Sequence, residues 1–189
     1  MKDVTGIVLA GGMGRRMGSV DKGLQVLHGK SMVAHVLERF APQVGAVIIN
    51  ANRNADTYAG YGYRVVPDAV GGYAGPLAGL HAGLGATETA FAVTCPCDSP
   101  FLPLDLVARL RAARDSRDAD LAVAKTGHQA HPVFALVQRA VLPHLEAFLQ
   151  GGGRKIDAWY ATLAIVEVSF DDQADAFRNI NTPEELRDA

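Results

Sequence analysis

The sequence predicts a three-layer α/β domain with a mostly parallel central sheet and helices on both faces. Short apolar runs alternate with amphipathic segments along most of the 189 residues, and this alternation is typical of parallel sheets covered by helices. The length fits one globular domain, and no linker, repeat or low-complexity tract divides the chain. We therefore expect residues 1–189 to form a single domain.

The strand-like runs are short and end in glycine, proline or polar residues. The first, GIVLA, leads into two glycines, which indicates a buried strand followed by a loop. Pro96 lacks a backbone N–H, so we end the fourth strand before it, at Thr94. We expect strands at residues 6–10, 46–50, 63–66, 90–94, 121–124, 133–137 and 165–168.

The helical segments repeat apolar residues at spacings of three and four. Residues 31–40 begin with Ser31, a favourable N-cap, and residues 104–113 show the same pattern. Residues 77–86 carry several glycines, each of which costs a helix about 1 kcal/mol relative to alanine. These glycines indicate either a close approach of a ligand or backbone, or a loop. Further helices are expected at residues 141–149 and 183–188.

The composition limits the classes of ligand. The formal net charge is −2, so no global basic field is available for nucleic acid, and an anionic substrate must meet local cations. No segment approaches the roughly 20 apolar residues of a membrane span, and the apolar run near the N-terminus is too short for a signal peptide. Cys95 and Cys97 are too few for a zinc site and suit a reducing compartment. We expect a cytoplasmic monomer that binds neither nucleic acid nor membranes.

Residues 9–18, LAGGMGRRMG, form a glycine-rich segment that follows the first predicted strand. Glycine allows backbone N–H groups to converge on phosphate oxygens, and Arg15, Arg16 and Lys22 add cations that suit phosphate. The segment matches neither G-x-x-x-x-G-K-[ST] nor G-x-G-x-x-G. It therefore indicates an anion-binding loop, with a flexible turn carrying solvated cations as the alternative.

Polar residues also follow the later strands, at the edge where parallel sheets bind ligands. Asp98 is placed to hold Mg²⁺ against a triphosphate, because Mg²⁺ needs only one or two carboxylates beside phosphate and water. Asp68 could accept hydrogen bonds from a nucleobase or bind a ribose, and Asn50 is the other candidate for these contacts. Both aspartates also fit ordinary turns beside proline, so the residues alone leave these alternatives open.

The C-terminal segment combines helix-capping residues with two unexplained asparagines. Thr182, Pro183 and Glu185 fit a capping box. Asn179 and Asn181 precede the cap, and they are equally consistent with a binding site and with a structural role. Arg154 and Lys155 follow three glycines and could bind an anionic group or form a solvated pair.

Taken together, eight segments resemble the bacterial molybdenum cofactor guanylyltransferases, the MobA family within the GT-A-like nucleotidyltransferases. They are LAGG at Leu9, RRMG at Arg15, DKGL at Asp21, NANR at Asn50, GPLAGL at Gly75, CPCDSP at Cys95, HPVFAL at His131 and NTPEEL at Asn181. The resemblance spans nearly the whole chain and implies a Rossmann-like, GT-A-like fold. It also implies Mg²⁺-dependent transfer of GMP from GTP to the terminal phosphate of molybdopterin carrying molybdenum, with release of pyrophosphate.

The resemblance also implies roles for individual residues. Lys22, Arg16 and Asp98 would be catalytic, and Asp98 would hold the metal. The GTP contacts would be Leu9, Ala10, Gly11, Gly12, Lys22, Asn50, Asp68 and Asp98. Asn179, Asn181, Arg154 and Lys155 are candidates for the acceptor side, and other cofactor-assembly proteins are candidate partners.

Two positions distinguish branches of the superfamily. Asp21 stands before Lys22, as in the guanylyltransferases, where the general superfamily has proline. Gly11 differs from the second alanine of the LAAG typical of molybdopterin cytidylyltransferases. The alternatives are a CTP-specific or sugar-phosphate nucleotidyltransferase of the same fold, or a non-catalytic GTP-binding module.

Overall fold

The computed structural model describes residues 1–10, 20–70 and 75–188, and within them a seven-stranded sheet forms the centre. The strand order is β5-β4-β1-β6-β8-β7-β9. The strands are β1 (Val4–Leu9), β4 (Ala46–Asn50), β5 (Arg64–Val66), β6 (Phe91–Pro96), β7 (Leu121–Thr126), β8 (Gln129–Gln138) and β9 (Ile165–Ser169). All neighbours are parallel except β8, which is antiparallel to β6 and β7. The expected mostly parallel sheet is confirmed.

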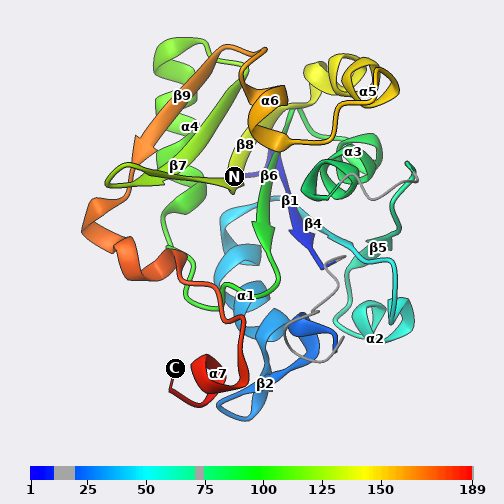
Figure 1. The fold of residues 1–189 in the computed structure, drawn as a ribbon, viewed down its shortest axis with the longest axis vertical. Coiled ribbons are helices and arrows are strands. Elements are labelled where there is room, and N and C mark those ends of the chain that lie inside the picture. Colours follow the sequence, from blue (N-terminus) through cyan, green and yellow to red (C-terminus); the bar gives the residue numbers. More distant parts are fainter. Residues whose placement is uncertain (11–19, 71–74, 189) are drawn as a thin grey trace.

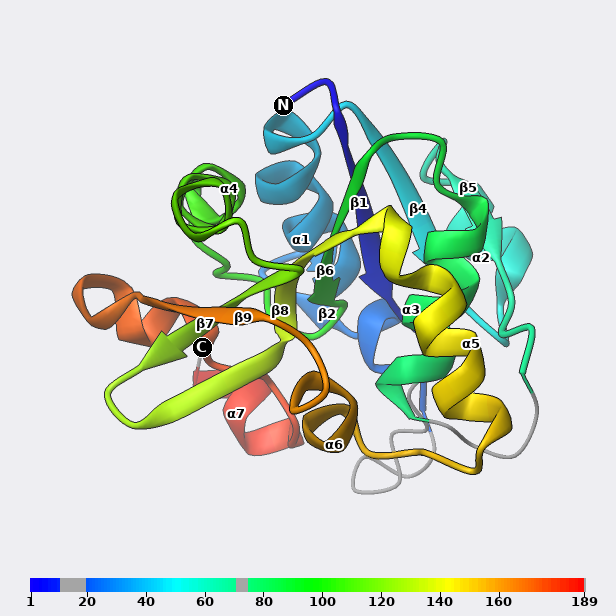
Figure 2. The same ribbon diagram turned by 90° about the horizontal axis from the view of Figure 1, so that it is seen from above.

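Helices cover both faces of this sheet. They are α1 (Met32–Phe40), α2 (Ala55–Ala59), α3 (Pro76–Ala86), α4 (Leu106–Arg117), α5 (Leu142–Gln150), α6 (Ile156–Tyr160) and α7 (Pro183–Asp188). Figure 2 shows α1 and α4 on one side of the sheet and α3 and α5 on the other. Successive β1 residues divide between the two cores. Val8 packs in the cluster that contains Phe40 and Leu110, whereas Ile7 packs with Leu80 and Leu145.

Glycine lets α3 lie unusually close to the sheet. A Cβ atom at Gly83 would stand 2.5 Å from Ile7 Cδ1, and a Cβ at Gly79 would overlap the side chains of Asn50 and Leu9. The expected helix over residues 77–86 is confirmed, and its glycines serve close packing against β1 and β4. Ser31 caps α1 as expected, since its hydroxyl accepts a hydrogen bond from the Ala34 N–H.

The prediction that the fourth strand ends at Thr94 is wrong, because β6 continues through Pro96. The N–H of Cys97 donates to the Leu9 carbonyl, so the residue before it points its nitrogen away from β1. On the opposite side of β6, where β8 lies, the pairing between the two strands stops at Val93. Pro96 therefore occupies a strand position at which no donor is required.

Several short elements were not anticipated. They are α2, α6 and a small antiparallel hairpin of β2 (Val26–Leu27) and β3 (Lys30–Ser31). Helix α4 begins two residues later than expected and extends to Arg117. Cys95 and Cys97 are free and buried. No helix among the described residues is long and apolar enough to cross a membrane.

Candidate active site

The sheet register brings the ends of four parallel strands to one edge. Leu9 pairs with Asn50 of β4 and with Pro96 of β6, and Asn50 pairs with Val66 of β5. The arrowheads of β1 and β6 point toward this edge, which is the lower one in Figure 1. The predicted ligand residues after β4, β5 and β6 therefore share one end of the sheet, where parallel α/β sheets bind ligands.

Lys22 lies at the centre of a polar cluster built from three separate parts of the chain. It begins a 3-10 turn, Lys22–Leu24, and its Nζ lies 3.1 Å from Asp98 Oδ2 and 2.6 Å from Asn181 Oδ1. The Lys22 and Asp98 side chains are 22% and 11% exposed. The charges are therefore poorly solvated, and their interaction is stronger than at an open surface.

The C-terminal segment, residues 179–181, reaches this cluster because hydrogen bonds hold it to the residues that follow β6. The Ile180 N–H donates to the Asp98 carbonyl at 3.0 Å, and the buried Ser99 hydroxyl donates to Asn179 Oδ1 at 2.5 Å. The two asparagines thus have different roles. Asn181 presents its side chain to Lys22, and Asn179 anchors the segment through Ser99.

A second cluster forms where β4 and β5 end. Asn50 is 2% exposed, and its Nδ2 donates to the Val66 carbonyl and to Asp68 Oδ1. Asn52 makes two contacts with Asp68: its Nδ2 donates to Asp68 Oδ2 at 2.8 Å, and its Oδ1 accepts from the Asp68 N–H at 2.8 Å. Each carboxylate oxygen of Asp68 therefore keeps acceptor capacity for a ligand in a fixed orientation.

The oxygen atoms around Lys22 also fit a divalent cation. The Lys22 ammonium already places a positive charge between Asp98 Oδ2 and Asn181 Oδ1, so these hard oxygen donors converge on one point. No group of three or more His, Cys, Asp or Glu residues that could hold a metal exists among the residues described. Asp98 would therefore share Mg²⁺ with substrate phosphates and water, which is the coordination that Mg²⁺ usually adopts.

The remaining predicted site residues lie in several places. Leu9 ends β1, and the Ala10 N–H donates to the Asn50 carbonyl at 2.8 Å. Gly11, Gly12 and Arg16 lie outside the described residues. Arg154 donates to the carbonyls of Leu149 and Gly153, so its guanidinium covers the C-terminal end of α5. Lys155 precedes α6.

Sequence reasoning missed one network entirely. The carboxylate of Asp21 accepts hydrogen bonds from Tyr58 of α2 and from Asn54, which precedes α2. The alternating asparagines of the sequence NANRN were a usable signal, since three amides at spacing two favour side-chain contacts at a strand end.

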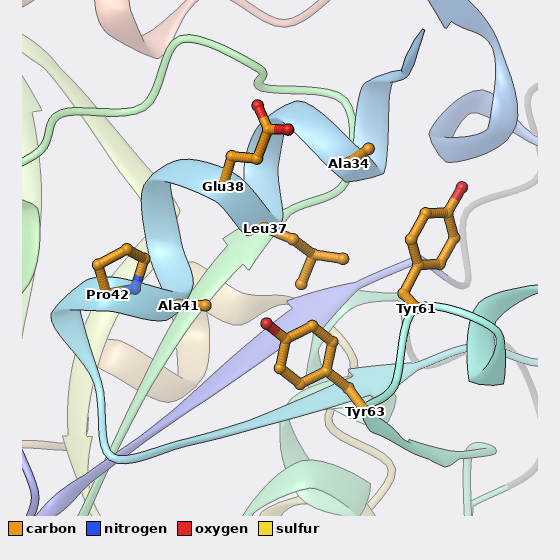
Figure 3. Close-up of a pocket in the computed structure, with 7 residues that line it drawn as sticks. All are labelled: Ala34, Leu37, Glu38, Ala41, Pro42, Tyr61 and Tyr63. Atoms are coloured by element: carbon orange, nitrogen blue, oxygen red, sulfur yellow. The ribbon is translucent and has the colours of Figure 1, made fainter.

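A surface cleft of about 390 Å³ lies elsewhere, between α1 and the loop before β5. It is lined by Ala34, Leu37, Glu38, Ala41, Pro42, Tyr61 and Tyr63 (Figure 3).

Comparison with known proteins assigns the family. The model of the MobA-like NTP transferase domain matches residues 6–164. The chain belongs to the MobA-like NTP transferase family. The molybdenum cofactor guanylyltransferase of Cupriavidus necator is 53% identical over 98% of this chain and 95% of its own length. The protein of the same name from a Shewanella species is 48% identical, covering 96% and 92%.

Solved structures support this assignment. Molybdopterin-guanine dinucleotide biosynthesis protein A from Archaeoglobus fulgidus superposes with a TM-score of 0.79 at 26% identity, covering 97% of this chain and 95% of that one. The bifunctional IspDF of Campylobacter jejuni has a TM-score of 0.74 at 14% identity, covering 98% of this chain and 53% of that one, and shows the shared fold alone. In this MobA-like transferase, Asn179 and Asn181 lie beyond the region that the family model matches.

Proposed function

We propose that the protein transfers GMP from GTP to the terminal phosphate of molybdenum-carrying molybdopterin, with release of pyrophosphate. The observation that carries this proposal is the convergence of Lys22, Asp98 and Asn181 at the carboxyl edge of the sheet. The curated relatives at 53% identity carry the name of this activity. The free, buried Cys95 and Cys97 suit a reducing compartment such as the cytoplasm.

The chemistry is an in-line displacement at the α-phosphorus of GTP. An oxygen of the acceptor phosphate forms a bond to this phosphorus while the bond to the bridging oxygen of the β-phosphate breaks. The electron pair of that bond leaves with pyrophosphate. The acceptor phosphate is already ionised at neutral pH, so the site needs no strong base. Its work is to position the two anions and to stabilise the charge that develops.

Lys22 is the described cation best placed for this work. Its side chain retains 22% exposure, and lysine is a compact charge on a flexible stem. The ammonium can therefore move from Asp98 toward the α-phosphate when GTP binds. Mg²⁺ held by Asp98 would supply further positive charge at the same phosphates. The amide oxygen of Asn181 accepts a hydrogen bond from Lys22 and so helps to hold the ammonium beside Asp98 before GTP binds.

Asp68 is the candidate for recognition of the nucleoside. A carboxylate can accept hydrogen bonds from both N1–H and the exocyclic amine of guanine, and adenine cannot make the same pair. Asn50 and Asn52 hold Asp68 in one orientation, which favours such a two-point contact. Binding of the ribose hydroxyls by Asp68 is the alternative, and nucleotide discrimination separates the two.

The direct test measures pyrophosphate release from each of the four NTPs, with and without molybdenum-loaded molybdopterin. We expect release that requires GTP, the acceptor and Mg²⁺ together, and that stops when EDTA is added. A preference for CTP would place the protein with the cytidylyltransferases. Binding of GTP without any pyrophosphate release would instead indicate a non-catalytic module.

The assignment of Asp98 is tested by a matched pair of substitutions. Asp98→Asn removes the charge beside Lys22, and we expect turnover to fall by about 100-fold or more, as for loss of a transition-state electrostatic group. Asp118→Asn makes the same chemical change at a side chain that is 96% exposed, and turnover should stay at the wild-type level. Retention of Mg²⁺-dependent transfer by Asp98→Asn would refute the metal assignment.

A further inference from the structure

One short segment holds carboxylates on both sides of the candidate active site. Asn50 and Asn52 bind Asp68 in the cluster assigned to the nucleoside. Asn54 Nδ2 donates to Asp21 Oδ2 at 2.9 Å. Asp21 directly precedes Lys22 in the chain. The sequence Asn50–Asn54 therefore connects the two clusters through side-chain amides at alternate positions.

Helix α2 adds a second contact to Asp21. The Tyr58 hydroxyl donates to Asp21 Oδ1 at 2.5 Å, and the Tyr58 side chain is fully buried. Burial raises the pKa of the Tyr58 hydroxyl, so it keeps its proton and acts as a donor. Asn54 thus binds one oxygen of the Asp21 carboxylate and Tyr58 binds the other, and the two contacts fix the orientation of the carboxylate.

The backbone beside Lys22 is packed equally tightly. A Cβ atom at Gly23 would lie 2.6 Å from the Tyr58 hydroxyl and 3.1 Å from the Cβ of Cys97. Cys97 in turn precedes Asp98. The turn that carries Lys22 is therefore held between α2 and the end of β6, and glycine is required for that approach.

We propose that Asn54 and Tyr58 position Lys22 through Asp21, and that the segment 50–58 thereby sets the distance between the nucleoside cluster and the reacting phosphates. This inference rests on the proposed function. Neither Asn54 nor Tyr58 needs to touch the substrate, so both are positioning residues. A displacement of a reacting group by about 1 Å can cost about 100-fold in rate, and loss of these two contacts would permit such a displacement of Lys22.

The test uses two substitutions that remove the side-chain donors while preserving the backbone. Tyr58→Phe deletes the hydroxyl and keeps the buried ring. Asn54 has φ of 54°, a conformation that glycine adopts freely, so Asn54→Gly removes the amide without backbone strain. Tyr61→Phe is the matched control, because its hydroxyl contacts Ser31 at 2.6 Å and has no part in the proposed site.

The double variant Tyr58→Phe/Asn54→Gly is compared with the wild type and with the same changes in a Lys22→Ala background. The effects of substitutions at coupled neighbours are not additive, so we expect kcat to fall about tenfold with Lys22 present and less than about twofold without it. Calorimetry with GTP gives a second cycle that needs no turnover. There we expect weaker binding from the double variant only when Lys22 is present.

These measurements distinguish failure of the inference from failure of the proposed function. If the wild type makes no product, the proposed function fails, and the calorimetric cycle still decides the inference. Equal losses with and without Lys22 would overturn it, as would turnover and GTP binding that match those of the Tyr61→Phe control. A loss that merely follows a lowered melting temperature would show a structural role and would also overturn it.

Discussion

The carboxylate of Glu185 accepts a hydrogen bond from the backbone N–H of Asn181, with 2.6 Å between nitrogen and oxygen. It also accepts from the Thr182 N–H at 3.2 Å, and the Glu185 N–H donates to the Thr182 hydroxyl at 3.1 Å. This capping box begins α7 and also holds Asn181, the residue whose side chain meets Lys22. A local device of helix formation therefore extends into the candidate active site.

We expect Glu185→Ala to lower both stability and turnover. Loss of a capping interaction costs about 1 kcal/mol, and release of the Asn181 backbone should displace its side chain from Lys22. Thermal unfolding and kcat measure the two effects. Glu185→Gln should retain most of both, because glutamine also completes a capping box. Glu184→Ala is the control, since its exposed pair with Arg187 contributes little. Full activity of the Glu185→Ala variant would show that the capping box does not influence the candidate active site.

Alanine substitutions at two glycines of α3 should have opposite effects. Gly79→Ala would press a methyl group into Asn50 and Leu9, and such overpacking costs about 1–3 kcal/mol. Because Asn50 binds Asp68, the KM for GTP should rise as well. Gly85 faces open space, so Gly85→Ala should stabilise the helix by about 0.5–1 kcal/mol. Denaturant unfolding of both variants measures whether each substitution lowers or raises the free energy of unfolding. A stabilised Gly79→Ala protein would contradict the close packing of α3.

The sequence predicted the elements with strong local patterns. β4 ends where expected because its apolar run AVII closes with the polar Asn50. The capping box of Thr182 and Glu185 is readable because its partners lie three residues apart. Helix α2 was missed because its five residues are too few for a helical apolar repeat to be recognised, and its contact with Asp21 comes from Tyr58 alone. The contact between Tyr58 and Asp21 spans 37 positions, and only the folded chain brings these residues together.

The site shows the same division. Residues that follow strands converge by topology alone, so Asn50, Asp68 and Asp98 could be predicted from the order of the elements. The hydrogen bond between Asn181 and Lys22 could not be predicted, because it spans 159 positions. It also depends on the hydrogen bond from the Ile180 N–H to the Asp98 carbonyl at the end of β6. The different roles of Asn179 and Asn181 likewise depend on the hydrogen bond from Ser99 to Asn179, which no local sequence pattern indicated.

The two thiols should be unreactive in the native protein. Burial, reinforced by neighbouring acidic groups, raises the pKa of both Cys95 and Cys97. At pH 8 a thiol reagent should therefore modify the folded protein far more slowly than the protein in denaturant. Rapid modification of both thiols under native conditions would contradict their placement in the core.

The same pKa shifts predict how stability depends on pH. The folded protein keeps these thiol protons, whereas the unfolded chain loses them near pH 8.5. The unfolded state then binds fewer protons, so the free energy of unfolding should fall as pH rises above about 8.5. Denaturant unfolding between about pH 7 and 9.5 measures this slope, before the tyrosines of the unfolded chain titrate. A Cys95→Ala/Cys97→Ala variant should show a smaller slope.

Asn52→Ala should reveal what Asp68 recognises. Asn52 is exposed and binds Asp68 through both its amide nitrogen and its amide oxygen. Its removal leaves Asp68 held by Asn50 through one carboxylate oxygen only, and loss of a hydrogen bond to a charged group costs about 1.5–3 kcal/mol. We expect the KM for GTP to rise about tenfold or more, with a small change in kcat and in melting temperature.

The nucleotide dependence of that loss decides between base and ribose. If Asp68 accepts hydrogen bonds from guanine, the GTP-over-ATP preference should narrow in Asn52→Ala, and ITP, which lacks the exocyclic amine, should lose less affinity than GTP. If Asp68 binds the ribose hydroxyls, binding of all NTPs should weaken by the same factor, because they share the sugar. An unchanged KM for GTP would show that the contacts of Asn52 with Asp68 do not contribute to nucleoside binding.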